Sequence, residues 1–87
     1  MIIKPKGVAV DVNAGLSTVP QLDGYGATIV SLVNTDVAAA IVALNPDGTS
    51  VYIAAGERVL IQKSPTTSLD GTGGGNSIWA SAVGFTN

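Results

Sequence analysis

The stretch ATIVSLVNTDVAAAIVALNPDGTSVYIAAGERVLIQK, residues 27–63, decides the fold of this chain. Its strongest local signal is the turn Asn45-Pro46-Asp47-Gly48. Proline at the second position of a turn fixes φ at about −65°, and glycine at the fourth accepts a left-handed backbone. The apolar runs on either side, 38–44 and 50–54, fit a period of two, so we predict a β-hairpin here.

A second turn, Ala55-Gly56-Glu57, follows the hairpin, and Gly56 can adopt a positive φ. The run after it, 58–63, alternates again and predicts a second hairpin that shares the middle strand. The run before the first hairpin, 27–34, is rich in β-branched residues and ends in turn-forming polar residues. Together these segments predict a central antiparallel β-meander over 27–63.

A helix competes with the strand over residues 37–44. That run is rich in alanine, and Thr35 or Asp36 is a suitable N-cap. Two features favour the strand: the hairpin turn follows directly, and the run is shorter than the about 10 to 14 residues usual for a globular helix.

The remaining segments frame the meander. Residues 1–13 predict an N-terminal arm or strand: Pro5 and two lysines fit an edge strand or an extended arm over residues 1–6, and the alternation from Gly7 to Asn13 predicts a half-buried strand. Residues 14–26 contain too many glycines and prolines for regular structure; we expect a loop pinned to the body by its apolar residues, Leu16, Val19 and Leu22. Residues 64–76 predict a Gly-rich loop, and 77–87 a closing strand whose Trp79 and Phe85 supply the largest piece of the core.

We therefore expect one domain over residues 1–87. A chain of 87 residues is too short for two, and short strands separated by turns, without a long helical period, predict an all-β fold. The fold class expected is a small antiparallel β-sandwich or partly open barrel of about six strands.

The composition points towards a protein that works inside an assembly. Charged residues are 11% of the chain and hydrophobic residues 46%, whereas a typical domain carries about 25% charged residues. A surface this poor in charge suits packing against neighbouring subunits. A monomer covered by serine, threonine and glycine is the alternative.

Several partner classes are disfavoured. The chain has four basic residues and a net charge of −2, which does not make the basic stripe that nucleic acids require. No apolar run approaches the about 20 residues that span a bilayer, and no signal-peptide block follows the N-terminus, so we expect synthesis in the cytoplasm without export. Without cysteine or histidine there is no disulfide and no sulfur or imidazole ligand for a metal.

The motifs that could carry chemistry have simpler explanations. The glycine run 71–75 lacks the Lys-Ser/Thr pair of a phosphate loop, and Asp47 and Asp70 each precede a glycine, as in ordinary turns. Lys63 and Ser64 are neighbours on a strand and would point to opposite faces. Glu57 and Arg58 are expected to form a solvated pair. We therefore expect no catalytic residue, no cofactor, no metal and no small-molecule substrate.

The chain resembles small virion structural proteins of tailed bacteriophages, particularly marine ones. The residues that carry the resemblance are Leu32-Val33-Asn34-Thr35-Asp36, Val42-Ala43-Leu44-Asn45, Ile53 to Pro65, and Ala82-Val83-Gly84-Phe85-Thr86-Asn87. The resemblance implies a non-catalytic protein present in many copies on the virion: capsid decoration or cement, or a neck or fibre component. Its partners would be copies of itself, the major capsid protein, or both.

Five apolar residues are the expected subunit contacts: Ile2, Ile3, Tyr25, Tyr52 and Leu60. For Tyr25, which lies between two glycines, a position capping the edge of the core is the favoured alternative. The competing function is a receptor- or carbohydrate-binding module that uses the Gly-rich loop with Tyr25 or Tyr52. An enzyme is the third and least favoured hypothesis.

Overall fold

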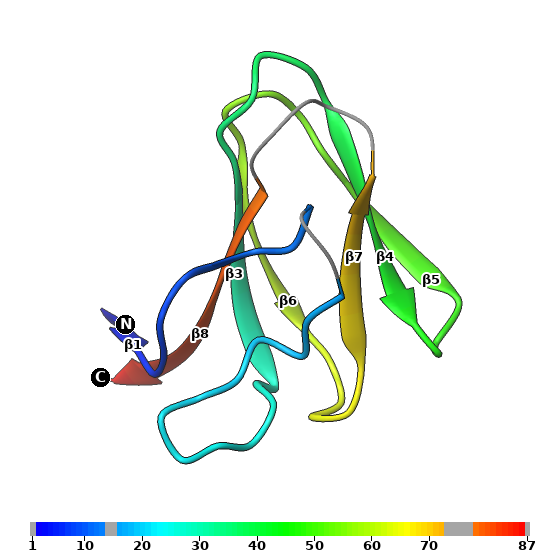
Figure 1. Cartoon of the computed structure of the whole chain (residues 1–87). Coiled ribbons are helices and arrows are strands. Elements are labelled where there is room, and N and C mark those ends of the chain that lie inside the picture. The colour runs from blue at the N-terminus through cyan, green and yellow to red at the C-terminus, as the bar shows by residue number, and fades with distance from the viewer. Residues whose placement is uncertain (1, 14–15, 73–77, 87) are drawn as a thin grey trace.

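The computed structural model describes residues 2–13, 16–72 and 78–86, and this part of the chain contains eight β-strands and no helix (Figure 1). The strands are β1 (Ile2–Pro5), β2 (Val10–Asp11), β3 (Ile29–Asn34), β4 (Ala40–Asn45), β5 (Thr49–Ile53), β6 (Arg58–Gln62), β7 (Ser68–Thr72) and β8 (Ile78–Thr86). The all-β prediction is confirmed, and residues 40–45 form a strand, not a helix.

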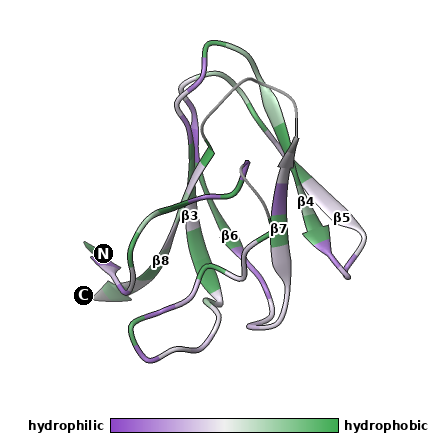
Figure 2. Cartoon of the chain, in the orientation of Figure 1, coloured by the Kyte–Doolittle hydropathy of each residue, from purple (hydrophilic) through white to green (hydrophobic). Residues whose placement is uncertain are grey.

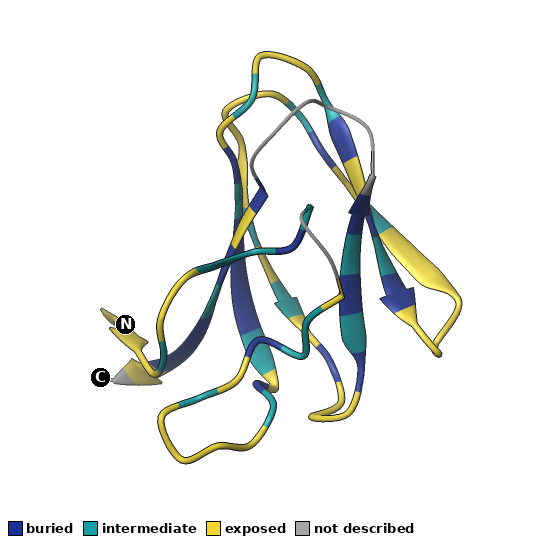
Figure 3. Ribbon diagram, viewed as in Figure 1, coloured by how far each residue is buried: buried dark blue, intermediate teal, exposed yellow. Residues whose placement is uncertain are grey.

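The strands form two antiparallel sheets. The larger sheet has the order β1-β8-β3-β6, and β2 also pairs with β8, on the same edge as β1. The smaller sheet has the order β5-β4-β7. The side of each sheet that faces the other supplies the buried apolar residues, as expected for a small β-sandwich (Figure 3).

The strand pairs are nested within one another. The first strands, β1 and β2, pair with the last strand, β8; Ser17 bridges to Leu69 of β7; β3 pairs with β6; and β4 pairs with β5. Nested antiparallel pairs wound into two facing sheets are the topology of a jelly roll. This chain has a reduced version of the topology, because among its described residues the second of the nested pairs consists only of the bridge between Ser17 and Leu69.

The predicted hairpin at Asn45-Pro46-Asp47-Gly48 is confirmed. β4 and β5 pair from Ala40↔Ile53 to Leu44↔Thr49, and Gly48 has a φ of 77° and donates its N–H to Leu44 O at 3.0 Å. The Asn45–Pro46 peptide bond is cis. The turn therefore forms where the sequence places it.

The predicted meander over 27–63 is wrong beyond this hairpin. β6 pairs with β3 instead of β5, since residues 54–57 carry the chain from one sheet to the other. The backbone of this corner bonds to the end of β3: Gly56 N donates to Asn34 O at 2.9 Å, and Asn34 N donates to Glu57 O at 3.0 Å. Gly56 has the expected positive φ, 74°. A turn of the expected kind thus joins two sheets, because its hydrogen bonds are taken by a strand distant in sequence.

The predicted Gly-rich loop over 64–76 is also wrong in part. Residues 68–72 form β7, which pairs with β4 and buries Leu69 completely. Gly71 packs closely there, since a Cβ would lie 2.9 Å from Ile78 Cδ1 and 3.3 Å from Asn13 Cα. The stretch 73–77 lies outside the described residues, so the rest of that loop and the first position of the closing strand are not placed.

The closing strand β8 exists, but its aromatic residues do not supply the core. Its inward side chains are Ile78, Ala80 and Ala82, whereas Trp79 and Phe85 are 40% and 39% exposed. Buried Val, Leu and Ile side chains from the other strands fill the interior, led by Leu32, Ile53 and Leu69. The space between the sheets is therefore filled by aliphatic residues of small and medium size.

In the N-terminal segment Ile2–Pro5 form the expected edge strand, β1, but of the strand predicted over residues 7–13 only Val10–Asp11, β2, is formed. In the loop that follows, Val19 is fully buried, but Leu16 and Leu22 are exposed, so only one of the three predicted anchors holds. Gly26 lies directly against the backbone of Pro65, where a Cβ would overlap the Pro65 carbonyl. This close approach fixes the end of the loop to the connection between β6 and β7.

Candidate interaction surface

The side of the larger sheet that faces away from the smaller sheet is the main candidate site, and we call it the outer face. Directly opposite residues of antiparallel strands share one face, so the register defines its members. The outer face consists of Ile3 and Pro5 of β1, Asp11 of β2, Ile29, Ser31 and Val33 of β3, Arg58, Leu60 and Gln62 of β6, and Trp79, Ser81, Val83 and Phe85 of β8.

These residues form ordered rows across the strands. One row runs Asp11, Trp79, Val33 and Arg58, from β2 at one edge to β6 at the other. The next row along the strands runs Ser81, Ser31 and Leu60. Further along, Val83 lies opposite Pro5 and Phe85 opposite Ile3.

The outer face exposes several large apolar side chains at once. Ile3, Leu60, Trp79 and Phe85 are each between 39% and 45% exposed. Figure 2 shows hydrophobic residues along β3, β6 and β8, and Figure 3 shows exposed positions on β6 and β8, whereas β3 is buried or half-buried. A contiguous apolar surface of this kind on a small protein is typical of an interaction site.

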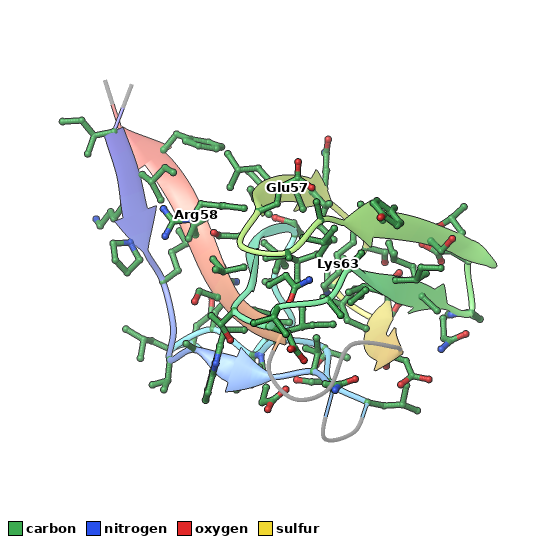
Figure 4. All side chains as sticks on the ribbon, turned by 90° about the horizontal axis from the view of Figure 1, so that it is seen from above. Glu57, Arg58 and Lys63 are labelled. Carbon is green, nitrogen blue, oxygen red and sulfur yellow. The ribbon has the colours of Figure 1, made fainter. Side chains whose placement is uncertain are left out.

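Charges are confined to the two edges of the outer face. Among its described strand residues the charged ones are Asp11 and Arg58, which stand at opposite ends of the same row. The Asp11 carboxylate accepts the Asn13 N–H at 2.9 Å, which fixes the side chain at the β2 edge. In Figure 4 Arg58 lies on the side of the larger sheet remote from the smaller sheet.

The five residues predicted as contacts are all exposed, but they lie on different surfaces. Ile3 and Leu60 belong to the outer face, whereas Ile2 pairs with Thr86 and points to the opposite side of β1. Tyr52 lies opposite Ile41 on the exposed side of the smaller sheet. Tyr25 is 72% exposed on the loop before β3, so it does not cap the core. The structure brings together only Ile3 and Leu60 on one face.

Trp79, Phe85, Asp11 and Arg58 are the most informative of the members that sequence reasoning missed. The alternation in 78–85 separates the two aromatic residues from Ile78, Ala80 and Ala82. That pattern gives two faces without saying which one meets the second sheet. The row that joins Asp11 to Arg58 depends on pairing between strands far apart in sequence, and no local signal reveals it.

A polar cluster near the turn of the first hairpin is the second feature of interest. Thr67, which is almost completely buried, donates its hydroxyl to both carboxylate oxygens of Asp47, at 3.1 and 3.3 Å. Lys63 is 7% exposed, donates from Nζ to Ser64 O at 3.2 Å, and lies between the sheets in Figure 4. Burial lowers the pKa of the Lys63 ammonium from its ordinary value, and the attraction of Asp47 offsets part of that shift. These contacts tie the β4–β5 turn to the β6–β7 connection.

The other charged positions singled out from the sequence belong to a turn or to a strand. Glu57 Oε1 accepts the Ala54 N–H at 2.9 Å and so closes its own turn, and Asp70 lies opposite Ala43 in the smaller sheet. Within residues 2–13, 16–72 and 78–86 no group of three or more acidic side chains is gathered to hold a metal ion. The described part of the chain also contains no helix of the length and hydropathy needed to cross a membrane.

A shallow open pocket of about 270 Å³ lies where β1 meets the loop before β3. It is lined by Lys4, Pro5, Lys6, Gln21, Leu22 and Asp23. The loop is shaped by its own hydrogen bonds: Gln21 N donates to Tyr25 O at 2.8 Å, and Tyr25 N donates to the Asp23 carboxylate at 2.9 Å. Tyr25 therefore stands next to a concave surface that carries amide, carboxylate and ammonium groups.

Comparison of the chain with protein-family models, with curated proteins and with solved structures found no match in any of the three.

Proposed function

We propose that this chain is a non-catalytic structural protein of a phage virion, which acts by packing against other subunits. Its most specific form is capsid decoration or cement, in many copies at the surface of the head. The partners are other copies of the chain, the major capsid protein, or both. The observation that carries the proposal is the apolar outer face, with charges only at its edges among the described strand residues.

The physical support is that an apolar surface of this kind is unfavourable on a monomer exposed to water. Several large side chains on this surface are about 40% exposed. When a partner covers them, each Å² of apolar area removed from water stabilises the complex by roughly 25 cal/mol. The low charge of the whole chain, 11%, makes repeated packing of subunits easier. Jelly-roll folds occur in viral capsids, lectins and cupins, so the topology alone does not choose among functions.

Two measurements test the proposal. Light scattering after size exclusion should show oligomers of the purified chain that grow with concentration, or stable binding to assembled capsids. Mass spectrometry of purified particles from a phage that encodes the chain should find it at a copy number comparable to the capsid protein. A chain that stays monomeric at high concentration, ignores capsids and is missing from the particles would overturn the proposal.

The second candidate is a receptor- or carbohydrate-binding module, and the pocket beside Tyr25 is the observation that favours it. Sugar sites combine an aromatic face with hydrogen-bonding groups, here Gln21 and Asp23 of the pocket wall. A glycan array probed with the wild-type chain and with Tyr25→Ala and Gln21→Ala variants tests this function. Glycan binding that both variants lose would favour it over the packing role.

A further inference from the structure

We infer that the outer face forms a two-fold symmetric interface between two copies of this chain, in which Asp11 of each copy faces Arg58 of the other. This inference rests on the proposed packing function and names the partner and the contacts. Its basis is the arrangement of the row Asp11, Trp79, Val33 and Arg58.

The row is complementary to itself. When a second copy is turned by 180° about an axis parallel to the strands and laid on the first, β2 of one copy meets β6 of the other. The acidic end of each row then lies over the basic end of its counterpart. A symmetric dimer uses the same patch twice, so one Asp–Arg match creates two identical contacts, one at each edge. An interface with an unrelated protein would not require an acidic and a basic residue at opposite ends of the same row.

The centre of the face fits the same operation. In this arrangement Trp79 of one copy faces Val33 of the other, and the small residues Ser81 and Ser31 face each other in the next row. Large side chains thus meet medium ones, and short side chains let the two sheets approach. Apolar groups at the centre with charges at the rim are the usual organisation of a protein interface.

The size of the face fits a weak, reversible dimer. β8 has nine residues, β3 six, β6 five, and β1 and β2 together six; at about 3.4 Å per residue and about 4.8 Å between strands they cover roughly 420 Å² on each copy. The two copies together would bury roughly 850 Å², which is below the about 1,000 Å² expected of a stable interface and falls in the range of weak, transient contacts. We therefore expect a dimer that dissociates on dilution.

Charge reversal tests the symmetry directly. Asp11→Arg alone places two basic residues opposite each other at both edges, and Arg58→Asp alone places two acidic residues there. Each variant should self-associate at least about tenfold more weakly than wild type, since two attractive contacts become repulsive. An equimolar mixture of the two variants should form a heterodimer of about wild-type affinity. In that heterodimer the two substituted positions attract each other at one edge, and the native Asp11 and Arg58 attract each other at the other edge.

Sedimentation velocity over a concentration series, in about 50 mM and about 500 mM salt, measures these affinities, because screening at the higher concentration weakens exposed charge contacts. Circular dichroism confirms that each variant is folded. Lys4→Asp is the matched control: it reverses a charge on the opposite side of β1 and should leave the dissociation constant unchanged. Recovery in the mixture supports the inference even if one variant alone is less stable than wild type.

Three results would overturn the inference. They are a monomeric wild-type chain, self-association that neither charge reversal weakens, and a mixture that does not recover. If the chain still binds capsids or still forms oligomers in these cases, the packing function stands and only the assigned interface fails. If the chain neither associates nor occurs on particles, both fail.

Discussion

The two faces of the larger sheet differ in a way that runs against the usual distribution of side chains. The inner face of β8 presents Ile78, Ala80 and Ala82, all buried, whereas its outer face presents the aromatic residues Trp79 and Phe85, both about 40% exposed. Burial of large aromatic residues is normally the largest single gain in a core. In this molecule both aromatic residues lie on the surface. The interior is therefore filled without them, and their apolar area is left for contacts outside the fold.

The inner face of β8 carries small and medium side chains because the rest of the interior is already filled by aliphatic residues. The core is built from Val, Ala, Ile and Leu, and the sheets that enclose it are joined at their corners by short connections. An indole or phenyl ring on the inner side of β8 would compete with Leu32 and Leu69, which are both completely buried. Equivalent substitutions on the two faces should therefore have unequal effects.

The largest expected effect is on the inner face. Leu32→Ala should lower the free energy of unfolding by about 3 kcal/mol, because it leaves a cavity in a fully buried site of β3. The matched change on the outer face, Leu60→Ala, should cost less than about 1 kcal/mol, since Leu60 is 45% exposed. Urea unfolding at low protein concentration measures both values. Equal losses would contradict the assignment of the two faces.

A smaller effect is expected from adding volume to each face. Ala80→Leu should destabilise the fold by about 2 kcal/mol, because Ala80 is fully buried and packed against β3. Ser81→Leu, at the next position and on the outer face, should change the stability by less than about 0.5 kcal/mol. If both substitutions cost the same in thermal unfolding, the inner face is not the tightly packed one.

A charge at the end of the inner face gives a smaller, pH-dependent effect. Burial lowers the pKa of Lys63 from 10.5, so between its folded value and 10.5 the unfolded chain binds more protons. Stability should therefore rise with pH across that window, and below it Lys63 should add no dependence on pH. Lys63→Met should remove this rise, and Lys4→Met, at an exposed position of β1, should retain it. Denaturant melts in steps from about pH 7 to about pH 10.5 measure the difference. A rise that survives Lys63→Met would exclude Lys63 as its source.

The outer face can be monitored without any substitution. Trp79 is the only tryptophan of the chain, so its fluorescence reports on that face alone. Acrylamide quenching should weaken, and the emission should move to shorter wavelength, as protein concentration rises and a second copy covers the indole. Neither change alters the fold. Quenching that does not vary over a wide concentration range would place Trp79 outside any contact between copies.

Sequence by itself determined most of the local structure. The β4–β5 hairpin, the turn at Gly56, the edge position of β1 and the all-β class follow from turn chemistry and from alternation, which act over a few residues. The low charge of the chain likewise indicates, from composition alone, a surface suited to packing.

The tertiary structure alone decided how these pieces combine. It placed β6 beside β3 instead of β5, made residues 68–72 a strand, and turned Trp79 and Phe85 outwards. Each of these outcomes depends on pairing between segments far apart along the chain. A period of two specifies two faces of a strand, but only the approach of the second sheet selects the buried one. The same long-range pairing sets Asp11 and Arg58 at opposite ends of one row, which is why the candidate interface could not be found from local patterns.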